Sequence, residues 1–134
     1  MFTRIVRILS LGVLIALLTS CASAAQSGLK QLTDKDAGST VQLRIGDNLE
    51  VALAGNPTTG YTWEVSPAAD VLVEQQGEPQ FKSDSNALGA GGIMTLKFKA
   101  VKEGAASLKL IYHRTFEPNV PPLQTFEVKL VVAQ

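Results

Sequence analysis

The 134-residue chain has little of the side-chain chemistry that enzymes and metal proteins use. It holds one cysteine, Cys21, and one histidine, His113, which excludes an internal disulfide, a Cys–His nucleophile pair and a site with several His and Cys ligands. It contains no Gly-x-Ser-x-Gly elbow and no phosphate loop. A carboxylate pair stays open, but the acids are scattered over surface-type positions. We therefore expect neither an enzyme nor a bound metal or cofactor.

The sequence also lacks an excess of one charge. Twelve Lys and Arg balance twelve Asp and Glu, and no basic cluster is visible, so nucleic acid is not an expected partner. Internal repeats and long apolar runs with a 3.6-residue period are missing as well. Instead, apolar and polar residues alternate with a period of two, which indicates strands.

The first 20 residues have the layout of a secretory signal. Two arginines precede an apolar run at residues 8–18, which is shorter than the ~20 residues needed to span a bilayer. The sequence Leu-Thr-Ser-Cys at residues 18–21 resembles a bacterial lipobox. That resemblance implies that Cys21 is acylated and becomes the mature N-terminus. Cleavage a few residues later, or an ordinary buried Cys21, are the alternatives.

This interpretation divides the chain into three parts. Residues 1–20 form the expected signal peptide, residues 21–35 a small and polar tether, and residues 36–134 the folded domain. We expect the protein in the bacterial cell envelope, held to a membrane by lipid on Cys21. Ala22 after the cysteine favours the periplasmic face of the outer membrane.

Apolar and polar residues alternate in about seven short runs between residues 41 and 132. One domain with this pattern predicts an all-β fold, an immunoglobulin-like antiparallel sandwich of two sheets and about seven strands. Trp63 shares one face of an alternating run with Tyr61 and Val65, so we expect its indole between the sheets. We also expect a monomer.

Three unusual stretches separate these runs, at residues 56–60, 82–92 and 114–122. They are every second connection. Successive connections of an up-and-down sandwich alternate between its ends, so all three are predicted at the same end. Loops on a rigid scaffold often carry binding function.

The first stretch reads Asn56-Pro57-Thr58-Thr59-Gly60, followed by Tyr61. Pro57 fixes φ and Gly60 can take φ > 0, which is all that a plain turn requires. The two threonines are additional. Their hydroxyls either hold the loop rigid by binding nearby backbone, or face a partner.

These stretches resemble the motifs of the chagasin family of cysteine-peptidase inhibitors. The first matches the family's NPTTG motif with its following aromatic, and Gly89-Ala90-Gly91-Gly92 matches its glycine cluster. Arg114-Thr115-Phe116 matches Arg-Pro-Trp/Phe in part, with Thr115 where the family usually has proline. The resemblance covers residues 41–132. It implies a reversible inhibitor of papain-like cysteine peptidases that fills the active-site cleft with three loops, Thr59 lying nearest the catalytic cysteine.

The residue types fit that role, since aromatic and arginine side chains are enriched among interface hot spots. Phe116 is the expected aromatic anchor and Arg114 the charged one. Gly91 and Gly92 would let the backbone approach a partner, and Thr115 would leave the third loop looser. Taken singly, the glycines fit a flexible loop, Phe116 the core and Arg114 a solvated strand end. The alternative function is a lipid-anchored immunoglobulin-like envelope module for adhesion or assembly.

Overall fold

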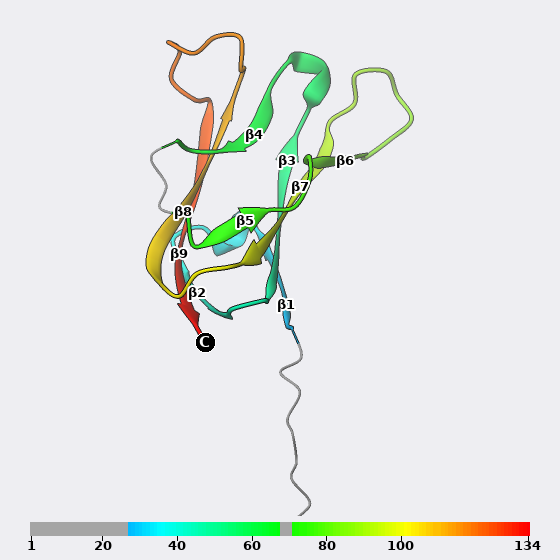
Figure 1. Cartoon of the computed structure of the whole chain (residues 1–134). Coiled ribbons are helices and arrows are strands. Elements are labelled where there is room, and N and C mark those ends of the chain that lie inside the picture. The colour runs from blue at the N-terminus through cyan, green and yellow to red at the C-terminus, as the bar shows by residue number, and fades with distance from the viewer. Residues whose placement is uncertain (1–26, 68–70) are drawn as a thin grey trace, which may run out of the picture.

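The computed structural model describes residues 27–67 and 71–134, which form two β-sheets packed face to face (Figure 1). The expected signal peptide at residues 1–20 and the expected lipid attachment at Cys21 lie outside the described residues. Within the described part, no helix is long and apolar enough to cross a membrane.

The described chain contains nine strands and two short 3-10 turns. In chain order they are β1 (Leu29–Thr33), η1 (Asp34–Asp36), β2 (Thr40–Arg44), β3 (Asn48–Gly55), η2 (Pro57–Thr59), β4 (Thr62–Val65), β5 (Val73–Gln75), β6 (Gln80–Ser83), β7 (Gly92–Ala100), β8 (Gly104–His113) and β9 (Gln124–Ala133).

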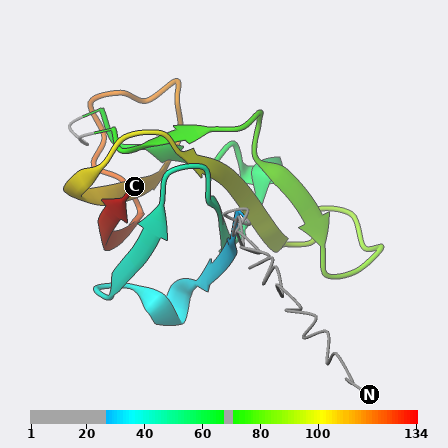
Figure 2. The same ribbon diagram turned by 60° about the horizontal axis from the view of Figure 1, so that its bottom comes forward.

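One sheet has the strand order β1-β3-β7-β5, with β6 also paired to β7, and the other has the order β2-β9-β8-β4. This confirms the two-sheet sandwich, but the expectation of purely antiparallel sheets is wrong. β1 pairs with β3 in parallel, and β2 pairs with β9 in parallel. The reason is that η1 interrupts the first strand, so its two halves join different sheets. Figure 2 shows this segment crossing one side of the sandwich.

The structure has more strands than the seven predicted, because β1 was assigned to the tether and residues 71–83 form both β5 and β6. Residues 29–35, expected in the tether, lie in β1 and η1 instead. Leu32 is buried opposite Val51 of β3. Its two leucines, Leu29 and Leu32, are three residues apart and show no period of two, which is too weak a signal for a strand and explains the misplaced boundary.

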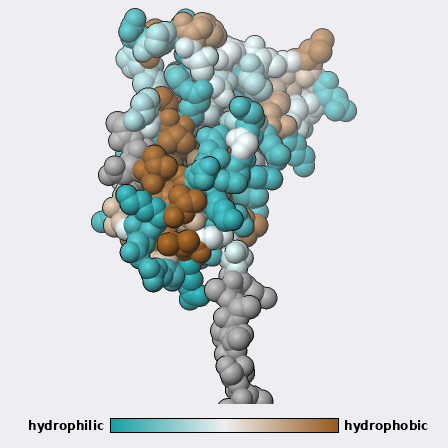
Figure 3. Space-filling view, in the orientation of Figure 1, coloured by the Kyte–Doolittle hydropathy of each residue, from teal (hydrophilic) through white to brown (hydrophobic). Residues whose placement is uncertain are grey.

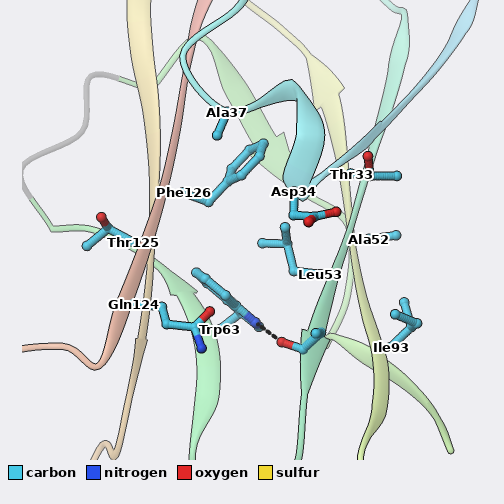
Figure 4. A pocket seen from close by; sticks show the side chains of 11 residues that line it. Thr33, Asp34, Ala37, Ala52, Leu53, Trp63, Ile93, Gln124, Thr125 and Phe126 are labelled. Carbon is cyan, nitrogen blue, oxygen red and sulfur yellow. Dashed lines mark hydrogen bonds between the residues drawn. The ribbon is translucent and has the colours of Figure 1, made fainter. Parts of the chain in front are cut away.

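The core lies between the sheets and consists of the apolar residues at alternate strand positions, in one continuous cluster. Trp63 in β4 is 3% exposed, which confirms its expected place. Its Nε1–H donates to the Ala54 carbonyl of β3 at 2.9 Å (Figure 4). The indole therefore packs in the core while its polar group is satisfied by the opposite sheet.

A pocket of about 440 Å³ opens beside the indole, on the side of the sandwich near η1 (Figure 4). It lies where β1 has ended: the last residues of β3 pair with β7 on one edge, and within the described chain no strand pairs with their other edge. Trp63, Leu53 and Phe126 contribute to its apolar lining. None of the lining residues belongs to the three unusual loops, so the pocket is separate from them.

The connections β3–β4, β6–β7 and β8–β9 all lie at the upper end of the molecule in Figure 1. The prediction that the three stretches share one end is therefore confirmed. The strands β3 and β8, which lead into two of these loops, are eight and ten residues long. The loops thus rest on long strands whose alternate residues are buried near the loops.

Candidate functional site

The β3–β4 loop is a compact turn whose polar groups bind one another. The Asn56 side chain accepts from the Thr58 amide at 3.2 Å and from the Thr58 hydroxyl at 2.6 Å. The Thr59 hydroxyl donates to the Asn56 carbonyl at 2.6 Å. Both threonine hydroxyls are thus used inside the loop, which supports the interpretation that they hold it rigid. Residues 57–60 are all exposed, so this rigid turn presents its surface to solvent.

Gly60 ends the turn for two separate reasons. Its φ of +81° lies in the left-handed region, which glycine adopts without a Cβ clash. In addition, a Cβ at this position would lie 3.1 Å from Cε1 of Phe116. The glycine therefore lets the third loop pack directly on the first.

Below the loop lies Tyr112 of β8, which is buried at 6% exposure and was not singled out from the sequence. Its hydroxyl accepts from the Asn56 backbone N–H at 2.8 Å. Its ring stacks on Tyr61 with centroids 5.2 Å apart and packs against Trp63 at 5.0 Å. Alternation along β8 agrees with the inner position of Tyr112, but nothing in that pattern indicates where a tyrosine hydroxyl reaches.

The β6–β7 loop contains a tight turn at its tip. The Ala90 amide donates to the Ala87 carbonyl at 3.2 Å, and Gly89 has a φ of +72°, the arrangement of a type II turn with glycine at its third position. Leu88 precedes that glycine and is fully exposed. The Asn56 amide group donates to the Gly89 carbonyl at 2.9 Å, so the first loop holds the second.

Gly91 and Gly92 differ from the expectation that both face a partner. Gly92 is the first residue of β7, is buried, and is paired with Ser83 of β6. A Cβ there would collide with the Lys82 carbonyl. Gly92 therefore permits close strand packing within this chain, and its assignment as a partner contact is wrong. Gly91 has room for a Cβ, whose nearest neighbour would be the Gly55 carbonyl at 3.7 Å.

In the β8–β9 loop, the Arg114 side chain contacts the β3–β4 loop. Its Nε donates to the Thr59 carbonyl at 3.1 Å, and its guanidinium carbon lies 4.5 Å from the Tyr61 ring centroid. Nη1 is also 3.5 Å from a carboxylate oxygen of Glu117. Arg114 is therefore neither a solvated strand end nor a free charged anchor; it connects the third loop to the first.

Phe116 is 68% exposed, which rules out the core position considered from sequence. Its ring packs beside Gly60 and lies 5.9 Å from the Arg114 guanidinium carbon. The Glu117 amide donates to the Arg114 carbonyl at 3.0 Å, so Thr115 and Phe116 are the two central residues of a β-turn. The backbone hydrogen bond that closes this turn therefore fixes the position of the exposed Phe116 ring.

The three loops form one surface whose polar groups largely pair with one another and whose exposed tips include apolar side chains. Figure 3 shows hydrophobic side chains at the upper end of the molecule, including the tip of the β6–β7 loop. Leu88 was missed from the sequence, although an apolar residue in a polar loop was a signal.

His113 lies outside this surface. It is half-buried, and its Nε2 lies 2.8 Å from a carboxylate oxygen of Glu64. No group of three or more potential metal ligands occurs among residues 27–67 and 71–134.

Comparison with known proteins gives consistent matches. Residues 42–130 match the family model described as Chagasin family peptidase inhibitor I42. The chain is 31% identical over 104 residues to Amoebiasin-1 of Entamoeba histolytica, covering 75% of this chain and 97% of that protein. It is 29% identical over 106 residues to Chagasin of Trypanosoma cruzi, covering 75% and 94%. A cysteine protease inhibitor from Entamoeba histolytica has a similar fold, with a TM-score of 0.65, 23% identity, and coverage of 80% of this chain and 97% of that one.

Proposed function

Since the chain belongs to the chagasin family of peptidase inhibitors, we propose that it inhibits papain-like cysteine peptidases reversibly by filling their active-site cleft with three loops. The papain-like target class is what the loop motifs imply. The observation that carries the proposal is the set of hydrogen bonds between loops, from Asn56 to Gly89 and from Arg114 to Thr59. These bonds combine three separate connections into one binding surface.

A rigid surface suits an inhibitor because the cost of ordering flexible loops is subtracted from the binding free energy. Pro57 restricts φ, and the Thr58 and Thr59 hydroxyls are bonded within the loop. A turn held from inside also resists the extended conformation in which a peptide bond would be presented for cleavage. We assign Thr59 the closest approach to the catalytic cysteine.

Two exposed apolar side chains supply anchors on either side of the first loop, and only one of them, Phe116, was expected from the sequence. Phe116 extends from the third loop and Leu88 from the second, while the first loop hydrogen-bonds to both of these neighbours. Burying an aromatic side chain at an interface centre typically contributes about 2 kcal/mol or more. We propose that Phe116 makes the largest single contribution and that Leu88 contacts the opposite cleft wall.

The alternative of an envelope module for adhesion or assembly is not favoured. The family to which the chain belongs is described as a family of peptidase inhibitors. An adhesive sandwich would also have no need for three mutually bonded loops at one end.

The direct test is titration of the chain from Gln26 onward against papain, a cathepsin L-like enzyme and a cathepsin B-like enzyme. We expect reversible, active-site-directed inhibition of at least one of them. Phe116→Ala should weaken it by about 2 kcal/mol. Val101→Ala removes another exposed apolar side chain, from the β7–β8 turn outside the three loops, and should leave inhibition unchanged. Full activity of all three enzymes at micromolar inhibitor would contradict the proposal.

We also propose that lipid on Cys21 anchors the protein in the bacterial envelope. Support comes from the sequence at residues 18–21, which resembles a lipobox. A single acyl chain binds a membrane only marginally, so stable anchoring would require the several chains of a bacterial lipoprotein. Cys21→Ser should abolish labelling by a radioactive fatty acid and leave unprocessed precursor. Equal labelling of the variant and the parent would contradict lipidation at this cysteine without affecting the inhibitor proposal.

A further inference from the structure

Asn56 is the residue on which the geometry of the first two loops depends. Its side chain and its carbonyl hold the Thr58 amide and both threonine hydroxyls, and its amide group holds the Gly89 carbonyl. A displacement of the Asn56 backbone would therefore move the whole β3–β4 turn and release the β6–β7 loop.

The backbone at this point is fixed from below by core side chains. Gly55, the residue before Asn56, packs so closely on Met94 that a Cβ would lie 2.6 Å from its sulfur atom and 3.6 Å from Cε2 of Tyr112. The Asn56 N–H itself donates to the Tyr112 hydroxyl at 2.8 Å. These contacts join the loop to the sandwich core.

We propose that Tyr112 is a positioning residue for inhibition, acting through its hydroxyl on the Asn56 backbone. Tyr112 is 6% exposed, so its ring is shielded from solvent while its hydroxyl reaches the base of the loop. Tyr61 and Trp63 pack against the ring and fix its orientation. The rigidity of the core is thereby transmitted to the exposed turn. This inference rests on the proposed function, because the loop has to be an inhibitory one.

Tyr112→Phe in the full-length protein tests the hydroxyl alone, since the ring and its stacking remain. A part-buried N–H that loses its partner gives up the free energy of a typical hydrogen bond, which corresponds to about a tenfold change in an equilibrium constant. We expect the inhibition constant for papain to rise about tenfold. We also expect hydrogen exchange of the Asn56 amide, measured by NMR, to accelerate by about the same factor.

Val132→Ala is the matched control. Val132 is a buried core residue of β9, paired with Gly104 at the far end of β8 from Tyr112. Its truncation should lower the melting temperature at least as much as Tyr112→Phe does, while the inhibition constant and Asn56 exchange stay at the parent values. That contrast separates loop positioning from general loss of stability.

Three outcomes would overturn the inference. Unchanged Asn56 exchange in Tyr112→Phe would show that the hydroxyl does not hold this amide. Faster exchange with an unchanged inhibition constant would show that holding it is irrelevant to binding, and an equal effect of Val132→Ala would reduce the role to stability. Failure of the parent protein to inhibit papain and the two cathepsin-like enzymes is a different result, since it contradicts the proposed function itself while the exchange measurement still reports on the hydrogen bond.

Discussion

Arg114 and Thr59 are joined by a hydrogen bond from the arginine Nε to the threonine carbonyl, 3.1 Å long. The guanidinium also lies over the Tyr61 ring. A charged donor bound to a backbone carbonyl is stronger than a neutral one, and a guanidinium above an aromatic face adds a cation–π attraction. The positive charge of the third loop therefore stabilises the first loop within this chain.

Arg114→Lys is predicted to weaken inhibition even though it preserves the charge. Lysine has no planar group that can donate from Nε while lying over Tyr61, so the exchange is not conservative at this site. We expect an increase of about tenfold in the inhibition constant, equivalent to about 1.4 kcal/mol, with little change in melting temperature. Equal inhibition by the variant would mean that charge alone suffices.

Thr115→Pro is predicted to tighten binding. Thr115 is the first central residue of the turn closed by the Glu117 amide and the Arg114 carbonyl, a position at which proline is favoured. Proline there restricts the unfolded chain and typically stabilises by about 0.4–1 kcal/mol where the backbone is compatible. The inhibition constant and the melting curve measure both effects. Weaker inhibition by a variant that remains folded would show that the native φ of Thr115 differs from that of proline.

Much of this site could be predicted from sequence because the signals were local. Pro57, Gly60 and Gly89 report backbone requirements, and period-two alternation placed Trp63 between the sheets. Alternation also fixed the parity of the connections, which brought the three loops to one end. These inferences needed no knowledge of distant contacts.

The remaining features depend on pairings between residues far apart in the chain. Arg114 and Thr59 are 55 residues apart, and Tyr112 and Asn56 are 56 apart, so no local pattern indicates either bond. The parallel pairing of β1 similarly depends on β3, 19 residues further along at its first paired position. Gly92 was misassigned for a different reason: the backbone that it accommodates belongs to β6, a strand that the sequence did not separate from β5.

Gly92→Ala and Gly91→Ala form a matched pair that tests this correction. Neither glycine has a positive φ, so each substitution adds one methyl group without backbone strain. At Gly92 the methyl meets the Lys82 carbonyl, and forced overpacking costs about 1–3 kcal/mol. We expect a lower melting temperature for Gly92→Ala and almost none of that loss for Gly91→Ala. Equal stability of the two variants would contradict the close approach of β6 and β7.

Asp47 directly precedes β3, at the end of that strand opposite the three loops, and predicts how the stability of the fold depends on pH. Its carboxylate accepts from the Arg44 amide at 2.8 Å and from the Gly28 amide at 2.7 Å. These two backbone hydrogen bonds, the Arg44 bond foremost, hold the pKa of Asp47 below its ordinary value. Asp47 thereby closes the β2–β3 turn and fixes the chain where it enters β1.

A folded-state pKa below the unfolded one means that the unfolded chain binds the proton more readily. The stability that Asp47 contributes is therefore complete above its unfolded pKa of about 3.9 and is lost as pH falls through the lower, folded value. Asp47→Asn should reduce the free energy of unfolding at pH 7, because an amide cannot accept at both positions, and should flatten the decline below about pH 4. Asp34 is an exposed residue of η1, and Asp34→Asn serves as the control. The free energy of unfolding of this variant should change with pH as that of the parent does. Denaturant unfolding from pH 7 to pH 2.5 measures all three proteins, and a decline equally steep in Asp47→Asn and the parent would show that other carboxylates cause it.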